Sequence, residues 1–562
     1  MWRQRYLSLS NVFLAGYSLL LCAAVWLALA TIHVESIDAP FWDAWLYTDP
    51  PKVLADLFRL HNSHPLATGK LLFAVDYYLF SGRGNFLRAV LVLELASSIA
   101  AIILLARLAE ITDRIALAAI GCTAVVLLFS PFAFENLTWG FQVAWVAGIA
   151  GPVVSVAALA IFAEKKTPGW LALSYAALVA GMFGLASALL APFILSFMAY
   201  WLRLNWRVAA GFLFAAVIAW SLYIGNGAGA AHPTAALHMP GAVVLYVVRY
   251  LGGLPGSAAN YFSYYRFNAP DALSAATYSG LILIVANSVL AWWHFRHAGR
   301  ERGVVGLLAI SAICLMTAGL TALGRISAPE MALSSRYTMT GSLYTAVTIA
   351  MAFSFFSRRP DRRPIFLLSS LVVVILALVL IAAFPVIRNL GGRDREETAG
   401  LTALVAGVDD TRAIERLAFR PPDAIAESAR LKREGKFHFA NFWARRVGSR
   451  FETTSSALCP GTIEAGEKIG TDGMRVNGTV ARRLIGGARE IVLVDASGLI
   501  VGYGRVPARP SDLYWWLMWP DLASPWQGHL KAMSFTGITA YAGDQKGWTC
   551  RIGQGAGRQG GE

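Results

Sequence analysis

Long apolar segments alternate with short polar connections along most of this chain. The apolar segments lie near residues 11–32, 86–107, 115–134, 139–163, 169–186, 188–204, 208–225, 277–296, 304–323, 338–357 and 365–387. Each has about the length that an α-helix needs to cross a hydrocarbon core of ~30 Å. The pattern predicts a mostly α, polytopic membrane protein with about eleven transmembrane helices. One kinked helix over 169–204 is an alternative, because Pro192 and several glycines interrupt that stretch.

The basic residues of the short connections fall on one side of this predicted topology. If the N-terminus, with Arg3 and Arg5, is cytoplasmic, every short basic connection is cytoplasmic too. These connections hold Arg107 and Arg114, Lys165 and Lys166, Arg203 and Arg207, Arg296, Arg300 and Arg302, and Arg358, Arg359, Arg362 and Arg363. The long loop 33–85, a loop from Gly225 to about Thr277 and the region after about Asn389 are then expected on the non-cytoplasmic side.

The C-terminal region changes character after the last apolar segment. We expect a transmembrane domain over 1–390, an amphipathic helical linker over 391–450 and a β-rich extracytoplasmic domain over 451–552. The Gly- and Gln-rich tail, 553–562, is expected to be disordered.

Strand patterns support the β-rich domain. The runs 490–495 and 499–504 are rich in β-branched residues and are joined by a short Gly-containing turn, which predicts a hairpin. Residues 538–542 look like a further strand. Cys459 and Cys550 lie in this region and would form a disulfide if it faces an oxidising compartment.

Composition agrees with a membrane protein. The chain is 56% hydrophobic and only 15% charged, whereas soluble domains carry about 25% charged residues. Its formal net charge of +14 could suggest nucleic-acid binding in a soluble protein. Here the basic connections and their contact with anionic membrane lipids explain the charge better, so we expect no nucleic-acid partner.

The predicted external loop 33–85 contains candidate catalytic groups. Asp43 stands between Trp42 and Trp45. Partial desolvation by the indole rings would suit its carboxylate to act as a general base, although interfacial aromatic anchors beside a solvated Asp give the same pattern. His61 and His64 would share a face if the segment is helical, and could bind a phosphate, a sugar or a metal, or transfer protons. Two histidines alone do not define a metal site, so the sequence predicts no specific cofactor. A bound divalent metal ion stays an alternative.

A second predicted external connection carries polar residues at the start of an apolar helix. Glu135, Asn136 and Gln142 either cap helices and hydrogen-bond between them or contact a substrate.

The third candidate group is basic. Arg325 and Arg336 lie on the predicted external side, against the usual distribution of positive charge, and Tyr337 stands beside Arg336. Arg336 either reaches lipid phosphates or holds a substrate phosphate with its planar guanidinium group. We favour the substrate phosphate, because positive residues are disfavoured on that side.

Several short sequences, taken with the helical arrangement, resemble a known class. They are Phe41-Trp42-Asp43-Ala44-Trp45, His61-Asn62-Ser63-His64, Glu135-Asn136-Leu137-Thr138-Trp139-Gly140-Phe141-Gln142 and Ser335-Arg336-Tyr337. Over about residues 1–390 the chain resembles the GT-C class of membrane glycosyltransferases and a group of bacterial membrane proteins of that architecture. The chain departs from that class at two positions. Ala44 follows Asp43 where many such enzymes have paired acids, and Ser63 stands between the histidines where an acidic residue is expected.

The resemblance implies a function. It implies transfer of a sugar from a polyprenyl-phosphate donor to a glycan or lipid acceptor, on the extracytoplasmic face of the bacterial inner membrane. By position, Asp43 would be the base, and Arg336, with Arg325 or a histidine, would stabilise the phosphate leaving group.

Two other functions stay open at this stage. A transporter or flippase for a lipid-linked glycan would need ionisable residues near the midplane and an internal repeat, and we find only Glu94 and no repeat. A non-catalytic scaffold for envelope assembly would use the C-terminal domain as its binding part.

Overall fold

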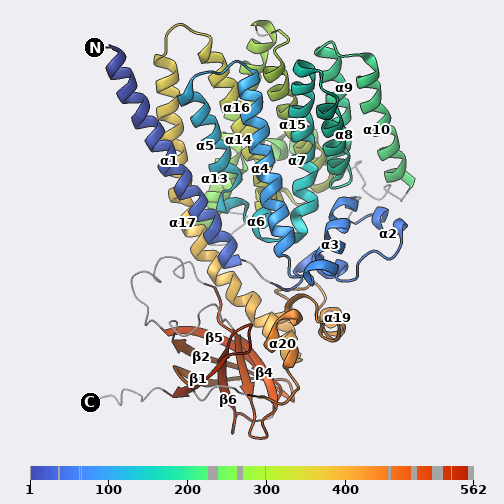
Figure 1. Ribbon diagram of the computed structural model, residues 1–562, viewed down its shortest axis with the longest axis vertical. Coiled ribbons are helices and arrows are strands. Elements are labelled where there is room, and N and C mark those ends of the chain that lie inside the picture. The colour runs from blue at the N-terminus through green and yellow to red at the C-terminus, as the bar shows by residue number, and fades with distance from the viewer. Residues whose placement is uncertain are drawn as a thin grey trace. The chain divides into compact units, whose positions relative to one another are not determined.

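The structure of the chain, a computed structural model, divides into two compact units (Figure 1). It describes residues 2–35, 38–61, 64, 66–225, 238–262, 270–297, 299–452, 457–481, 490–508, 523–532 and 534–554. The helical unit comprises Met1–Leu29, Pro51–Leu72 and Leu87–Val386. The C-terminal unit comprises Ala30–Pro50, Phe73–Phe86 and Ile387–Glu562.

Within the described residues, eight helices are long and apolar enough to cross a membrane. They are α1 (Trp2–Glu35), α4 (Asn85–Leu108), α7 (Val143–Lys165), α10 (Trp206–Gly225), α14 (Pro270–His297), α15 (Arg302–Arg325), α16 (Ser335–Ser357) and α17 (Arg363–Ala406). The other three predicted spans correspond to shorter apolar helices, α5 (Arg114–Leu128), α8 (Pro168–Met182) and α9 (Ala191–Trp201). A helical membrane-type protein is therefore confirmed, with fewer long helices than the eleven predicted.

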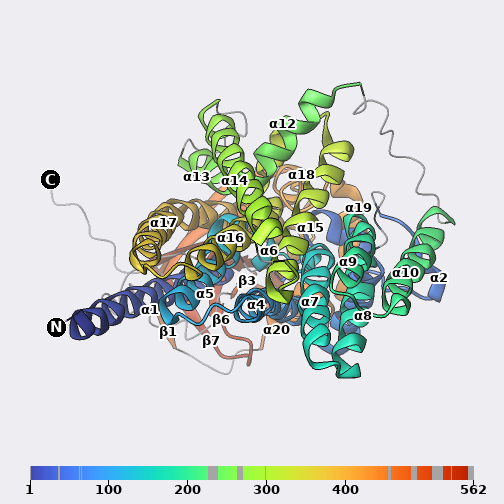
Figure 2. The same cartoon turned by 90° about the horizontal axis from the view of Figure 1, so that it is seen from above.

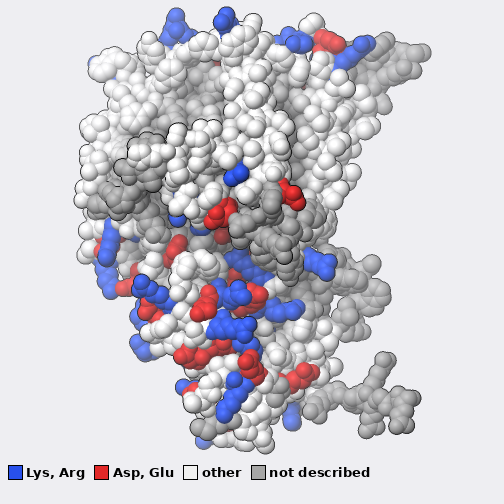
Figure 3. All heavy atoms as spheres, turned by 180° about the vertical axis from the view of Figure 1, so that it is seen from behind, with Lys and Arg blue, Asp and Glu red and all other residues white. Residues whose placement is uncertain are grey.

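The helices differ in how much apolar surface they bury inside the unit. Helices α7, α15 and α16 are mostly buried, whereas α1, α10, α14 and α17 expose most of their apolar residues. Figure 2 shows the same helices from above, with α1 tilted strongly. On the face in Figure 3, Lys and Arg gather at the upper end of the helical unit, above a broad belt without charged side chains. Such a belt suits a lipid environment, because water would disfavour so large an apolar surface.

Four of the basic connections meet at one end of the bundle. Arg362 Nη1 lies 2.9 Å from Asp113 Oδ2, which joins the α16–α17 connection to the start of α5. Arg358 Nη1 donates to Glu301 Oε1 at 2.7 Å, which joins it to the α14–α15 connection. Trp201 Nε1 donates to the Gly299 carbonyl at 3.3 Å, which brings the end of α9 to the same place. The basic connections thus cluster, as the alternating topology requires.

The uncertain stretch 169–204 forms two helices, α8 and α9, separated by η4 (Ala186–Leu190). Glycines of α7 and α8 let their backbones touch: a Cβ at Gly151 would collide with the Ala177 carbonyl oxygen, and one at Gly181 with Pro152. The chain reverses after α8, so one kinked helix is excluded here.

The predicted external loop between α10 and α14 contains two helices packed into the unit. They are α12 (Pro240–Leu251) and α13 (Gly253–Phe262). Tyr250 OH lies 3.2 Å from Thr340 Oγ1 of α16. Ser257 Oγ donates to the Leu333 carbonyl at 3.2 Å. A loop was the wrong expectation here, because the apolar face of α12 buries Tyr246 and Tyr250. The unit's remaining elements are α2 (Leu54–Phe58), η2 (Pro131–Ala133), α6 (Glu135–Thr138), η3 (Gly140–Gln142) and η6 (Pro329–Leu333).

A closed barrel forms the β-rich part of the C-terminal unit. Its strands are β1 (Leu458–Ile469), β2 (Gly473–Ala481), β3 (Glu490–Val494), β4 (Ile500–Arg505), β5 (Ala523–Leu530), β6 (Thr539–Gly543) and β7 (Thr549–Gln554). They follow the order β1-β2-β5-β4-β3-β6-β7, and a parallel pairing of β7 with β1 closes the barrel. The predicted hairpin is β3–β4, and the further predicted strand is β6. Of the expected disordered tail, Gly553 and Gln554 end β7, and 555–562 lie outside the described residues.

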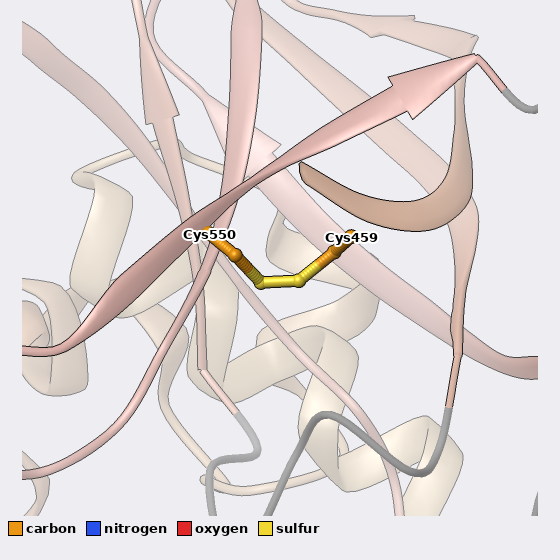
Figure 4. Close-up of a disulfide and its surroundings, with 2 residues drawn as sticks. All are labelled: Cys459 and Cys550. Carbon is orange, nitrogen blue, oxygen red and sulfur yellow. A yellow bond between two sulfur atoms is a disulfide. The ribbon is translucent and has the colours of Figure 1, made fainter. Parts of the chain in front are cut away.

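The disulfide Cys459–Cys550 joins the parallel pair that closes the barrel (Figure 4). The two Cα atoms are 5.6 Å apart, and 91 residues separate the cysteines in sequence. The bond therefore links the first strand of the barrel, β1, to the last strand, β7.

Residues 391–450 pack as part of the C-terminal unit instead of forming a linker. They hold the end of α17, α18 (Thr411–Ile414), α19 (Pro421–Glu434), η7 (Phe437–Ala440) and α20 (Phe442–Arg446). The reason is visible in β3, where side chains alternate between two cores. Ile491 and Leu493 face the barrel interior, whereas Val492 and Val494 join the cluster formed with these helices. The unit's N-terminal segments are η1 (Trp42–Tyr47) and most of α3 (Ala67–Phe80).

Candidate functional site

Residues from four separate stretches of the helical unit converge. The Trp145 and Tyr337 rings lie 5.2 Å apart, as do the Tyr337 and Tyr250 rings, and His64 lies 6.2 Å from Trp145. The Arg336 guanidinium lies 5.7 Å from the Tyr337 ring centre. Arg325 and Arg336 are both within electrostatic reach of Tyr246. We call this group the arginine–aromatic cluster; its members are His64, Trp145, Tyr246, Tyr250, Arg325, Arg336 and Tyr337.

The carboxylate of Glu135 anchors the start of α16. Glu135 Oε2 accepts from the Arg336 backbone N–H at 3.1 Å and from the hydroxyl groups of Ser334 and Ser335. A carboxylate at a helix N-terminus satisfies unpaired N–H groups and interacts favourably with the helix dipole. Glu135 therefore positions Arg336, and its Oε2 is occupied by that role.

Asn136 and Gln142, also candidates from the sequence, are buried beside this anchor. Asn136 Nδ2 donates to the Arg336 carbonyl at 3.0 Å, so both backbone groups of Arg336 are fixed. Gln142 is the N-cap residue of α7, less than one helical turn from the cluster's edge at Trp145, and is only 2% exposed. Asn136 therefore helps to fix the start of α16, and Gln142 lies buried at the start of α7.

Polar atoms without partners mark the cluster as a place for a ligand. Among the described residues, Tyr246 OH, Trp145 Nε1 and Asn136 Oδ1 are buried and make no hydrogen bond. An unpaired buried polar group costs about 1–3 kcal/mol, so such groups are usually satisfied. The Tyr246 hydroxyl and the Trp145 N–H can donate hydrogen bonds, and their position beside Arg325 and Arg336 suits an anion with several acceptor oxygens; Asn136 Oδ1 can only accept.

His64 is a neutral member of the cluster at physiological pH. Burial, the nearby Arg325 and His61 together lower the pKa of His64 to about 4. The Ala186 backbone N–H donates to His64 Nδ1 at 3.4 Å, which leaves Nε2 to carry the proton. His64 can therefore donate a hydrogen bond without adding positive charge.

The expected helical pairing of His61 and His64 does not occur. The two residues form an isolated antiparallel bridge, with backbone N–H···O distances of 2.9 and 2.8 Å. The His61 ring packs against Phe141 at 5.7 Å, away from the His64 contacts. Across the described part of the chain, no group of three His, Cys, Asp or Glu side chains could hold a metal ion.

The tryptophans around Asp43 belong to the C-terminal unit and have structural partners there. Trp42 Nε1 donates to the Arg416 carbonyl at 3.3 Å, and its ring lies 4.3 Å from Phe419. Trp45 Nε1 donates to the Leu417 carbonyl at 3.1 Å. They are therefore anchors for this segment and not free stacking platforms. The sequence candidates thus fall into two groups, one in each unit.

Asp43 itself is half-buried in η1 and held in a constrained backbone. Trp42 has φ +49°, a left-handed conformation that is unfavourable for a bulky side chain. The Trp42 N–H donates to the Leu417 carbonyl at 2.7 Å and compensates for this conformation. Strained residues held in place by surrounding bonds are frequent at functional sites.

Sequence reasoning missed Trp145 and Tyr246 as cluster members. Tyr246 and Tyr250 are four residues apart on α12, so they share a helix face. That spacing was readable in the sequence. It could not identify the partners of the two rings, because those come from α7 and α16.

A buried polar chain crosses the C-terminal unit. Tyr503 OH donates to Glu490 Oε1 at 2.7 Å and lies 2.9 Å from His438 Nε2. Gln545 Nε2 donates to Glu490 Oε2 at 2.7 Å. Burial raises the pKa of Glu490 to about 7 and lowers that of His438 to about 3.

We expect Glu490→Gln to change the pH dependence of stability. The wild-type folded state binds a proton at Glu490 up to about pH 7, whereas the unfolded state loses it near pH 4. The stability that the raised pKa of Glu490 contributes is therefore fully present below about pH 4 and is lost as the pH rises to 7. The stability of wild type relative to Glu490→Gln should fall by about 3 kcal/mol between pH 4 and 8.

Hydrogen exchange of the β3 and β6 amides, corrected for intrinsic rates, measures this difference. Glu415→Gln, an exposed carboxylate in the same unit, should show no such trend. A wild-type-minus-Gln difference that is flat with pH would contradict the prediction.

Comparison with known proteins adds no relationship: no protein-family model matches the chain, and no curated protein matches it.

Proposed function

We propose that the chain is a membrane glycosyltransferase of GT-C type. It would transfer a hexose or pentose from a polyprenyl-phosphate donor to an envelope glycan or lipid acceptor. The observation that carries the proposal is the arginine–aromatic cluster at one end of an apolar helical bundle. Two guanidinium groups, a neutral imidazole and unpaired donors suit a phosphate, and the aromatic rings suit a sugar.

The site lies where a lipid-linked phosphate could reach it. Arg325 ends α15, whereas Arg302 begins it among the basic connections. The helix has 24 residues, which corresponds to about 36 Å and exceeds a hydrocarbon core of ~30 Å. We propose that the basic connections face the cytoplasm and that the cluster opens at the opposite, periplasmic surface of the inner membrane. In this topology α5, α8 and α9 complete eleven spans.

The donor phosphate would be the leaving group. Arg336 and Arg325 would stabilise the negative charge that develops on it as the bond between the anomeric carbon and the phosphate oxygen breaks. Tyr246 and His64 would donate hydrogen bonds to the same phosphate. Glu135 and Asn136 would hold the Arg336 backbone fixed, so that little reorganisation is needed during the reaction.

The acceptor hydroxyl would form the new bond to the anomeric carbon. Asp43 would accept the proton of this hydroxyl. The phosphate would leave with the electron pair of the bond that breaks. The half-buried, constrained position of Asp43 supports this assignment, as does its place in the first long loop. A single displacement with a lipid-linked donor needs no nucleotide.

Arg336→Gln tests the proposal most directly. We expect transfer to fall about a hundredfold, because one charged donor to the leaving group is lost. Arg336→Lys keeps the charge but lacks the planar fork, so we expect a loss of about tenfold. The fold should survive, since Glu135 and Asn136 bond backbone groups of Arg336, which the variant keeps. The measurement is sugar transfer by membranes from cells expressing each variant.

Arg302→Gln is the matched control. It removes the same charge from an exposed position at the other end of α15 and should leave transfer unchanged. Transfer at the wild-type rate by Arg336→Gln would overturn the proposal. In a deletion strain, a missing sugar branch supports a transferase. Accumulation of a complete lipid-linked glycan in the cytoplasmic leaflet would instead indicate a flippase, and an unchanged glycan a scaffold.

A further inference from the structure

An open pocket of about 820 Å³ lies within the C-terminal unit. Among the described residues, four arginines line it, Arg83, Arg445, Arg446 and Arg450, together with one acidic residue, Glu452. Ligand sites commonly have volumes of about 300–1,000 Å³. The pocket is therefore large enough for an oligosaccharide of a few residues, and strongly positive.

Three arginines of this pocket differ in their partners from several other arginines of the unit. Arg393 pairs with Glu397, Arg430 with Glu427 and Glu434, and Arg475 with Asp410. By contrast, within the described residues no ion pair is found for Arg445, Arg446 or Arg450. Clustered guanidinium groups repel one another, so a lining in which positive charges outnumber negative charges favours an anionic ligand.

The pocket rests on a fixed framework. Arg83 Nη2 donates to the Ala440 carbonyl at 2.8 Å, and the Arg446 guanidinium lies 4.1 Å from the Phe442 ring centre. The Phe442 N–H donates to Gln545 Oε1 at 3.3 Å. Gln545 in turn bonds the buried carboxyl group of Glu490. The lining is therefore joined to the polar chain inside the unit and keeps its shape.

We propose that this pocket binds a saccharide that carries phosphate or carboxylate groups. The guanidinium groups would hold the anionic substituents in bidentate hydrogen bonds. The amides of Asn441 and Gln545 line the same pocket and would bond sugar hydroxyls. This site uses residues separate from the arginine–aromatic cluster and stands whether or not the chain transfers sugars.

The test uses the purified full-length chain in nanodiscs of zwitterionic lipid. Calorimetry or thermophoresis compares two matched pairs of probes: trehalose 6-phosphate with trehalose, and a hyaluronan tetrasaccharide with maltotetraose. We expect the anionic member of each pair to bind at least about tenfold more tightly, and less tightly as salt is added. Equal binding of the neutral sugars would overturn the proposal.

Variants locate the site. Arg445→Gln with Arg446→Gln should weaken anionic saccharide binding about tenfold or more, whereas Arg433→Gln, exposed elsewhere on α19, should not change it. Glu452→Gln removes the acidic residue of the lining and should tighten binding about two- to threefold, which misfolding could not cause.

Two further outcomes would overturn the proposal. Unchanged binding in the double variant would place the ligand elsewhere. Tighter binding of short-chain phosphatidylglycerol than of either anionic saccharide would assign the pocket to a lipid head group.

Discussion

Asp43→Asn is expected to reduce sugar transfer by about a thousandfold while leaving the chain folded. A positioned general base contributes about 10²–10⁴ to a rate, and an amide cannot accept the acceptor's proton. The change is isosteric, and the bonds that hold η1 come from Trp42 and Trp45, so its placement should persist. Transfer assayed over a pH series measures the effect and shows whether a titrating base has been lost.

Asp49→Asn is the matched control for this variant. Asp49 is an exposed carboxylate six residues farther along the same segment, and its replacement should leave the rate unchanged. Transfer at the wild-type rate by Asp43→Asn would show that Asp43 is not the base. The phosphate-binding role of Arg336 would still be tested separately, by Arg336→Gln.

Replacing Cys459 and Cys550 together by alanine should lower the free energy of unfolding of the barrel by about 4–5 kcal/mol. The bond closes a loop across 91 residues of separation, and a loop of that size loses about this much entropy in the unfolded state. Alanine is preferred to serine, because both side chains are buried in the apolar barrel core. Urea dependence of hydrogen exchange in β1 and β7 measures the difference.

Cys22→Ala controls for the loss of a thiol outside the barrel and should leave hydrogen exchange in the barrel unchanged.

Alkylation in intact cells adds an independent check on orientation. We expect Cys459 and Cys550 to be protected until a reductant is added, as in an oxidising compartment. Rapid labelling of both would place the C-terminal unit in the cytosol and contradict the proposed topology.

Local patterns determined the elements of the fold. The apolar runs predicted the long helices, because one helix can satisfy its own backbone in lipid and needs no distant partner. The β3–β4 hairpin was equally readable, since Gly498 supplies the positive φ of +81° that its short turn requires. The spacing of Lys and Arg placed the basic connections together, which the Arg362–Asp113 pair bears out.

The partners of each element depended on tertiary structure. Nothing in the sequence indicated that Ala30–Pro50 would fold with the C-terminal unit, because a contact between Trp42 and residue 417 joins positions far apart in the chain. The amphipathic pattern at 391–450 predicted helices but not what their apolar faces would cover. Only the alternation of Val492 and Val494 toward these helices answers that question.

The same division holds for the candidate sites. Residue types alone marked Arg325, Arg336 and Glu135, because charged groups at the mouths of apolar helices are rare and need a reason. The sequence could not show that Glu135 caps α16 while Arg336 keeps its guanidinium near Tyr337. It also gave no hint of the four-arginine pocket, whose lining comes from residues 83 to 545. Helix and strand formation is governed by near neighbours, whereas a binding site is made by side chains that only the packing of distant segments brings together.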